Sequence, residues 1–266
     1  MTSVLRNLFN HRNLLFQFVQ RDIVARYRGS YLGLVWTLVQ PLVMLVVYSF
    51  VFSVIFKVKW GNAEGVSKLD FAMVTFAGLI IFQIFSEPMY RSTAILSANS
   101  NYVKKVVFPL EILPTSAVFS GIILNMFSMI ILIATLFFYQ YPVGWNLLLI
   151  PVLILPLTLF TLGFSYIVTT LGVFFKDLGQ AMGIIMNILF YISPVFYPVT
   201  AVPKEFQIYM NLNPLTFFVE SFRAITIYNT QPNWMNYIVM LIISLFLFFL
   251  GSTLFNKSKE TFSDVI

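Results

Sequence analysis

The sequence predicts an all-α polytopic membrane protein, and two observations carry that prediction. First, 59% of the 266 residues are hydrophobic and only 10% are charged, whereas soluble domains are about 25% charged. Second, the chain contains apolar stretches close to the roughly 20 residues that a membrane-spanning helix needs, separated by short polar segments. Six spans are predicted, at residues 32–56, 71–89, 112–139, 147–175, 181–197 and 234–255.

The first stretch, 32–56, is interpreted as a retained helix because its apolar run is too long for the core of a signal peptide. The basic residues predict the orientation of the spans. Eleven of the 16 Lys and Arg residues lie before span one, between spans two and three, between four and five, or after span six. Cytoplasmic segments of membrane proteins are enriched in such residues. Both termini are therefore predicted to be cytoplasmic.

Residues 10–28 are predicted to form an amphipathic helix that lies on the membrane surface. One side of this helix carries Leu15, Phe18, Val19, Ile23 and Tyr27, and the other carries Asn13, Gln17, Arg21 and Arg28. Asp22 and Arg26 fall on the apolar side, where their spacing of four residues predicts that they pair. A simple topology anchor and a functional helix are equally good interpretations of this segment.

The polar stretch 91–113 is too long for a turn and too polar to span, so it offers a cytoplasmic surface to a soluble partner. Glu87 and Arg91, also four apart, are predicted to neutralise each other. Segment 204–228 is apolar but is broken at Asn211, Asn213 and Pro214 into two pieces too short to cross the membrane. We expect a re-entrant helical hairpin, in which Glu220 and Arg223 pair with one another.

Several kinds of chemistry are excluded by what the sequence lacks. It contains no cysteine and a single histidine, His11, so no catalytic or metal site is predicted. No glycine precedes a lysine, so the phosphate-binding loop of an ATPase is absent and any ATP must be bound by another chain. The basic residues lie beside apolar spans, where they set topology, and nucleic acid is not an expected partner.

Aromatic residues make up 18% of the chain, and two interpretations of them remain open. They form either an interfacial belt with lipid-facing phenylalanines or a lining on which sugar rings stack. The candidates for such a glycan path are Tyr48, Phe52, Phe56, Phe190, Tyr191, Phe196 and Tyr197.

Specific motifs resemble the membrane subunits of ABC-2-type polysaccharide exporters, the O-antigen, capsule and teichoic-acid permeases. Each motif alone is weak, and their order and spacing over essentially the whole chain carry the resemblance. They are residues 21–23 (RDI), 26–33 (RYRGSYLG) with Trp36 and Pro41, 104–109 (KKVVFP) with 113–114 (LP), 175–178 (FKDL), 213–215 (NPL) and the tail 255–264.

The resemblance implies one transmembrane domain over residues 1–266, in a multi-pass protein of the bacterial inner membrane. Two copies of this chain would join two ATP-binding subunits, which hold ATP and Mg, while this chain holds no cofactor. The complex would export a lipid-linked polysaccharide and contact membrane lipids. The residues that match family features are the substrate entrance at Arg21, Arg26 and Arg28, the ATPase-coupling residues Lys104, Lys105, Phe108, Lys176 and Asp177, and the outer gate at Asn213, Pro214, Glu220 and Arg223.

Three other functions are alternatives to polysaccharide export. An ABC-2 exporter of drugs or small lipids would use the same fold, with the arginines and aromatic residues serving only topology. A polytopic glycan-modifying enzyme would need membrane-embedded acids or histidines, and none lies at the middle of a predicted span. A passive channel would transport without ATP hydrolysis.

Overall fold

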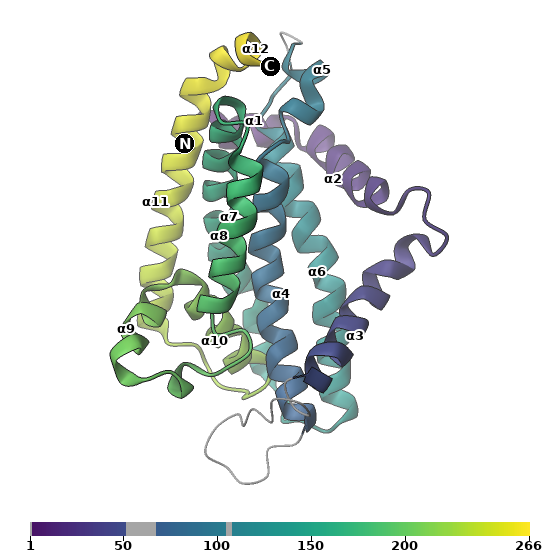
Figure 1. Cartoon of the computed structure of the whole chain (residues 1–266), viewed down its shortest axis with the longest axis vertical. Helices are drawn as coiled ribbons and strands as arrows, with labels where there is room; N and C mark the ends of the chain where they lie inside the picture. Colours follow the sequence, from purple (N-terminus) through teal and green to yellow (C-terminus); the bar gives the residue numbers. More distant parts are fainter. Residues whose placement is uncertain (1, 52–67, 105–107) are drawn as a thin grey trace.

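A computed structural model of the chain describes residues 2–51, 68–104 and 108–266, and within these ranges the regular structure is entirely helical. The prediction of an all-α protein is confirmed for this part of the chain. The helices, labelled in Figure 1, are α1 (Thr2–Asn10), α2 (Arg12–Tyr27), α3 (Trp36–Ser49), α4 (Lys68–Ser92), α5 (Ser100–Val103), α6 (Ile112–Phe138), α7 (Ile150–Phe174), α8 (Leu178–Ile192), α9 (Lys204–Leu212), α10 (Pro214–Thr226), α11 (Trp234–Ser258) and α12 (Phe262–Val265).

The long helices run up and down between two ends of an elongated bundle (Figure 1). Both chain termini lie toward one end, together with α1, α5, α12 and the turn between α7 and α8; we call this the termini end. Helices α9 and α10 lie at the opposite end, which we call the hairpin end. Helix α2 runs obliquely across the flank of the bundle, and α3 returns from the turn that follows it.

Four of the described helical stretches are long and apolar enough to cross a membrane: Asp70–Ser92, Ile112–Phe138, Trp145–Phe174 and Trp234–Val265. They correspond to four of the six predicted spans. The other two predicted spans, 32–56 and 181–197, contain α3 and α8, of 14 and 15 residues. At 1.5 Å per residue these helices are roughly 21–23 Å long, shorter than a hydrocarbon core of about 30 Å. Residues 52–56 of the first predicted span lie outside the described residues.

Helix α4 is the central element of the bundle. It packs against α3, α6, α7, α8 and α10, and 89% of its most apolar window is buried within the chain. Helix α11, in contrast, packs chiefly on α7, and only 28% of its window is buried. Because both helices are equally unable to face water, the open face of α11 is suited to contact lipid or another protein.

The α7–α11 contact depends on two glycines that let the backbones approach closely. A Cβ atom on Gly251 would lie 2.2 Å from the carbonyl oxygen of Gly163, and one on Gly163 would lie 2.6 Å from the carbonyl carbon of Leu247. Small residues commonly allow this kind of helix contact in membrane proteins, where packing replaces the hydrophobic effect. The pair therefore holds α11 against the bundle although most of α11 is exposed.

Candidate functional site

Helix α2 buries two of the residues on the side of segment 10–28 that was predicted to be apolar. Phe18 and Val19 are each 6% exposed, whereas Arg21 and Arg28 on the opposite side are exposed. The apolar side packs against α6 within the bundle. This helix is therefore attached to the protein, and its location on the membrane surface stays a prediction.

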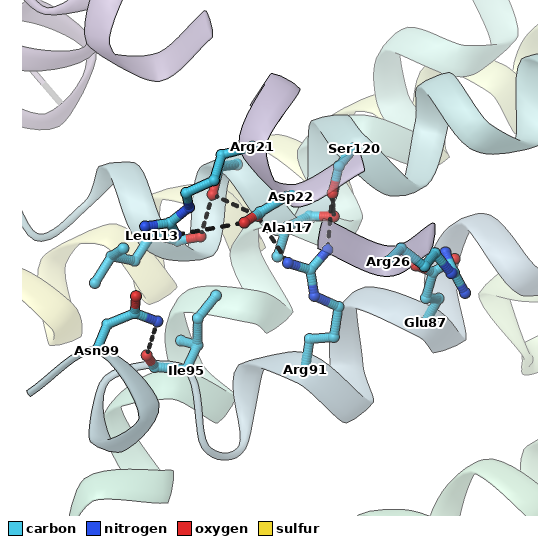
Figure 2. Close-up of polar contacts among 11 residues, drawn as sticks. Arg21, Asp22, Arg26, Glu87, Arg91, Ile95, Asn99, Leu113, Ala117 and Ser120 are labelled. Atoms are coloured by element: carbon cyan, nitrogen blue, oxygen red, sulfur yellow. Dashed lines mark hydrogen bonds and ion pairs between the residues drawn. The ribbon is translucent and has the colours of Figure 1, made fainter. Parts of the chain in front are cut away.

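The ion pairs of α2 differ from those that the four-residue spacing predicted. Asp22 does not pair with Arg26, and Glu87 does not pair with Arg91. Instead, Arg26 of α2 bonds Glu87 of α4, and Arg91 of α4 bonds Asp22 of α2 with 2.7 Å between Nη2 and Oδ2 (Figure 2). Each of the two ion pairs therefore has one partner on α2 and the other on α4, and the pairs join these helices.

Asp22 is the most enclosed member of this set, with its side chain 8% exposed. Its Oδ2 atom also accepts a hydrogen bond from the Ser116 hydroxyl of α6, at 3.1 Å. The Arg91 guanidinium donates from Nη1 to the Ser120 hydroxyl of α6, at 2.8 Å (Figure 2). Helix α6 thus supplies two hydroxyls that hold this ion pair, and α2, α4 and α6 meet at one polar junction.

A second contact joins α2 to the predicted coupling segment. Phe18, Tyr102 and Phe108 form an aromatic cluster with ring centroids 4.7–5.4 Å apart. The Arg21 guanidinium lies over the Phe18 ring at 4.1 Å and over the Tyr102 ring at 5.9 Å. The helix that carries the predicted entrance arginines is therefore packed directly onto the segment predicted to meet the ATPase.

The other predicted coupling residues lie at the same end of the molecule. Lys104 is exposed at the end of α5, and Lys176 and Asp177 are exposed in the turn between α7 and α8. Lys105 lies outside the described residues. These exposed side chains are available for contact with a soluble partner.

A buried carboxylate, Glu111, joins three distant parts of the chain at the termini end. Its side chain is 0% exposed; one oxygen accepts from the Asn7 amide of α1 and the other from the Lys259 ammonium group, each at 2.7 Å. Burial raises the pKa of Glu111, but hydrogen bonds from Lys259, from the backbone and from Asn7 outweigh it, and the pKa is lowered overall. The start of α6 is thereby tied to both ends of the chain.

At the hairpin end, the predicted break is confirmed at Asn213 and Pro214, whereas Asn211 lies within α9. The Asn213 side chain caps α10 by accepting from the Leu215 backbone N–H at 3.0 Å, and Pro214 occupies the first turn, where a missing N–H does no harm. The Asn213 amide also donates to the Ser193 hydroxyl after α8. The same two residues thus end α9, start α10 and attach the hairpin to the bundle.

The predicted pair between Glu220 and Arg223 is also confirmed, with 2.9 Å between Nη1 and Oε1. Arg223 is completely buried. Its guanidinium also donates to the backbone carbonyls of Val74 in α4 and of Pro194 and Val195 after α8, at 2.6–2.9 Å. Arg223 therefore joins three segments, which the spacing of the pair alone did not predict.

The predicted aromatic path residues are placed in several environments. Phe190 packs against Phe82, Tyr191 and Phe196, with centroids 4.9–5.7 Å apart. Tyr191 is 68% exposed, whereas Phe196 is only 5% exposed and belongs to the core. Tyr197 is half-buried, and Tyr48 lies in α3. Phe52 and Phe56 lie outside the described residues.

A polar pocket between α3, α4 and α6 was not predicted. Its volume is about 220 Å³, and Gln40, Gln83, Asn125 and Ser128 are among its lining residues. The sequence signal was available, since amide side chains inside apolar spans are costly in lipid and so mark inward-facing positions. These residues are neutral, so a signal based on ionisable groups in the spans does not include them.

The described residues contain no cluster of three or more His, Asp or Glu side chains that could hold a metal ion.

Comparison with known proteins adds a family and several relatives. The sequence model of a family described as ABC-2 type transporter matches residues 13–227. The O-antigen export system permease protein RfbA of Myxococcus xanthus is 29% identical, with 100% of each chain covered. RfbA of Klebsiella pneumoniae is 28% identical over 96% of this chain and 95% of its own. The polysialic acid transport protein KpsM of Escherichia coli is 24% identical over 90% of this chain and 91% of its own.

Proposed function

Because this chain belongs to the ABC-2 type transporter family, we propose that it is the membrane-spanning permease subunit of an ATP-driven exporter of lipid-linked polysaccharide. One observation carries the proposal: the chain aligns over its whole length with an O-antigen export permease. A polysialic acid transporter aligns over nine-tenths of it. Relatives named for two different polysaccharides favour a glycan as cargo over a drug or small lipid.

In this proposal residues 1–266 form one transmembrane domain in the bacterial inner membrane, with six spans. Helices α3 and α8 complete the set of six, and α9 and α10 form the re-entrant hairpin. The excess of basic residues on one side of the spans supports a cytoplasmic location for both termini. The termini end is then the cytoplasmic end, and the hairpin end faces the outside.

The functional unit comprises two copies of this chain and two ATP-binding subunits, which bind ATP and Mg. The exposed residues Lys104, Lys176 and Asp177, together with Lys105, meet the ATPase. Phe108 transmits the contact, since it packs both on Tyr102 in this segment and on Phe18 of α2. A displacement of the coupling segment by ATP binding is thereby passed to α2.

Helix α2 guards the entrance for the substrate. Arg21, Arg26 and Arg28 attract the anionic pyrophosphate of the lipid-linked substrate. Arg26 is bonded to Glu87, so a pyrophosphate competes with this carboxylate for the guanidinium. The arriving substrate thereby weakens a contact that joins α2 to α4, and it favours the arrangement in which α2 has moved away.

The hairpin is the outer gate, and its base is held by Asn213, Pro214, Glu220 and Arg223. The aromatic residues around α8, among them Tyr191, provide surfaces on which sugar rings stack as the glycan passes.

Co-purification from the native membrane tests the proposal. The chain is solubilised under mild conditions, and the proteins that accompany it are identified for the wild type and for Lys104→Glu with Lys105→Glu. We expect an ATPase to accompany the wild type and to be lost from the charge-reversed variant, because reversed charges repel the acidic partner surface.

Lys257→Glu is the matched control, since Lys257 is exposed near the C-terminus of α11 at the same end and belongs to no proposed contact. It should retain the ATPase. Recovery of no ATPase with the wild type contradicts an ABC exporter, and equal recovery with both variants places the docking surface elsewhere.

A further inference from the structure

The polar pocket between α3, α4 and α6 lies beside the proposed entrance. Arg26 of α2 and Glu87 of α4 line one part of it, and these two residues form the ion pair that joins the helices. The pocket therefore opens next to the contact that an arriving substrate loosens.

The pocket lies on the single open face of the most buried span. Among the described side chains of α4 from residue 70 onward, only Gln83 and Tyr90 are exposed, and Glu87 is half-buried. Positions 83, 87 and 90 share one face of a helix, and all three residues line the pocket. Helix α4 thus turns a polar face toward this space, although the rest of its surface is packed in protein.

Two serines and an asparagine supply polar groups to the pocket wall. Ser86 of α4, Ser128 of α6 and Asn125 of α6 all line the pocket, and they are 6%, 3% and 3% exposed. Asn125 donates to the Gly121 carbonyl through Nδ2, which leaves its amide oxygen available as an acceptor. The wall therefore offers hydroxyl and amide groups to a polar occupant.

The lining defines the chemistry of that occupant. Arg26 and Glu87 are the charged residues of the lining and pair with each other, so the rest of the lining is neutral. An apolar chain would leave the hydroxyls and the amides of Gln40 and Gln83 without partners. A neutral molecule with several hydroxyl groups satisfies both conditions, because hydroxyls donate to and accept from amides and serines alike.

Two aromatic residues strengthen this conclusion. Trp36 of α3 and Tyr90 of α4 line the pocket, and they are 41% and 44% exposed. The flat faces of such rings pack against the C–H faces of sugars, while hydroxyls turn to polar partners. Aromatic rings beside amides and hydroxyls suit a sugar ring better than a lipid glycerol group, which has no such face.

We infer that this pocket binds a neutral sugar ring, one near the lipid-linked end of the polysaccharide, while the arginines of α2 attract the charged group. The assignment rests on the proposed function. It places sugar recognition at Gln40, Gln83, Ser86 and Ser128, beneath the entrance helix and away from the aromatic residues around α8.

Trp36 provides the signal for a direct test. It becomes the only tryptophan when the other three of the four are replaced by phenylalanine. The full chain is reconstituted into phospholipid nanodiscs from a zwitterionic detergent without a sugar head group. Methyl glycosides of glucose, galactose, mannose and N-acetylglucosamine are then titrated while Trp36 emission is followed, and inorganic pyrophosphate serves as the anionic probe.

We expect a saturable change in emission with at least one glycoside. Pyrophosphate, which the proposed function directs to Arg26 at one part of the pocket, should not compete with the glycoside for binding. Gln83→Leu should raise the Kd about tenfold, the effect of losing one hydrogen bond of roughly 1.4 kcal/mol. Because Gln83 is exposed, this change leaves the core packing intact. Gln40→Leu, at a second exposed position, repeats the test, and Asn236→Leu, an exposed amide in α11, is the matched control that keeps the wild-type Kd.

No response to any glycoside up to its solubility limit, or the same Kd in all variants, overturns the assignment and leaves a water-filled pocket. A response to pyrophosphate alone overturns it in favour of an anion site. Surface polysaccharide in the native host separates the two proposals. If cells lacking the chain still export polysaccharide, the proposed function fails; if Gln83→Leu loses sugar binding but restores full export, only the sugar site fails.

Discussion

The two ends of the molecule use arginine in opposite ways. At the hairpin end Arg223 is completely buried and bonds three backbone carbonyls and Glu220. At the termini end Arg26 and Arg91 remain 38% and 34% exposed while they pair with carboxylates of a neighbouring helix. Breaking a buried pair from one side costs about 3–5 kcal/mol, whereas exposed pairs contribute about 0–1 kcal/mol.

This difference matches the role proposed for each end. Carbonyl groups cannot move away from Arg223 without the backbone moving, so the base of the hairpin is rigid. The arginines of the pairs at the termini end are partly exposed, so water and ions can also satisfy them and these pairs hold α2 to α4 less firmly. The contrast predicts a fixed hairpin base and a movable entrance helix.

The largest expected effect is at Arg223. Arg223→Met should lower the stability of the purified protein by about 3–5 kcal/mol, because the buried carbonyls of Val74, Pro194 and Val195 lose their donor. Unfolding of the nanodisc-embedded chain measures this. Glu220→Gln, which keeps an acceptor for Arg223 at a partly exposed position, should cost far less. Equal losses in the two variants would show that the pair with Glu220, and not the bonds to the backbone carbonyls, stabilises the base of the hairpin.

A second, smaller effect is expected at Gly78. A Cβ atom there would lie 2.7 Å from Nη2 of Arg223 and 3.2 Å from the Cα of Val195. Gly78→Ala should therefore cost about 1–3 kcal/mol through overpacking. Gly183→Ala in α8 is the matched control, since nothing lies within 4 Å of its Cβ position. Helix propensity should make that variant as stable as the wild type or slightly more stable.

The polar junction at the termini end should respond more weakly. A double-mutant cycle with Asp22→Asn and Arg91→Gln should give a coupling energy of about 1 kcal/mol or less, since Arg91 is one-third exposed and screened by solvent. The same unfolding assay measures it. A coupling energy as large as the Arg223 effect would mean that α2 is as firmly held as the hairpin.

The smallest expected effect is a pH dependence of stability that arises from Glu111, whose side chain is fully buried at the termini end. Its pKa is lowered by Lys259 and Asn7 despite burial. Its contribution to stability is therefore complete above the unfolded pKa of about 4.3 and is lost as the pH falls through the lower native value. The wild type should lose more stability than Glu111→Gln between neutral and acid pH. If stability falls with pH in parallel for the two proteins, the contacts of Glu111 with Asn7 and Lys259 contribute no pH-dependent stability.

The local parts of the fold could be read from the sequence. Long apolar runs identified four candidate spans, alternation with the helical period identified the buried side of α2, and Asn213 with Pro214 marked the start of α10. Each of these depends on neighbours within one or two turns of the same helix. The pair between Glu220 and Arg223 belongs to the same class, because both residues lie on α10.

The junction between α2 and α4 shows where such reasoning ends. Within each helix, Asp22 and Arg26 or Glu87 and Arg91 have the same four-residue spacing that produces pairs in isolated helices. Once α2 crosses α4, each arginine finds a carboxylate of the other helix within reach, and those partners are favoured instead. Spacing determines which partners are possible, and packing selects among them.

The amino-acid sequence was sufficient to establish a helical membrane protein, its family resemblance and its lack of recognisable catalytic motifs, because hydropathy, helical period and motifs are properties of short segments. The exchanged ion pairs, the three carbonyls around Arg223 and the polar pocket emerged only from the folded chain. Each of them joins helices that are far apart in the sequence, and its energy depends on distances that only the packing of those helices creates.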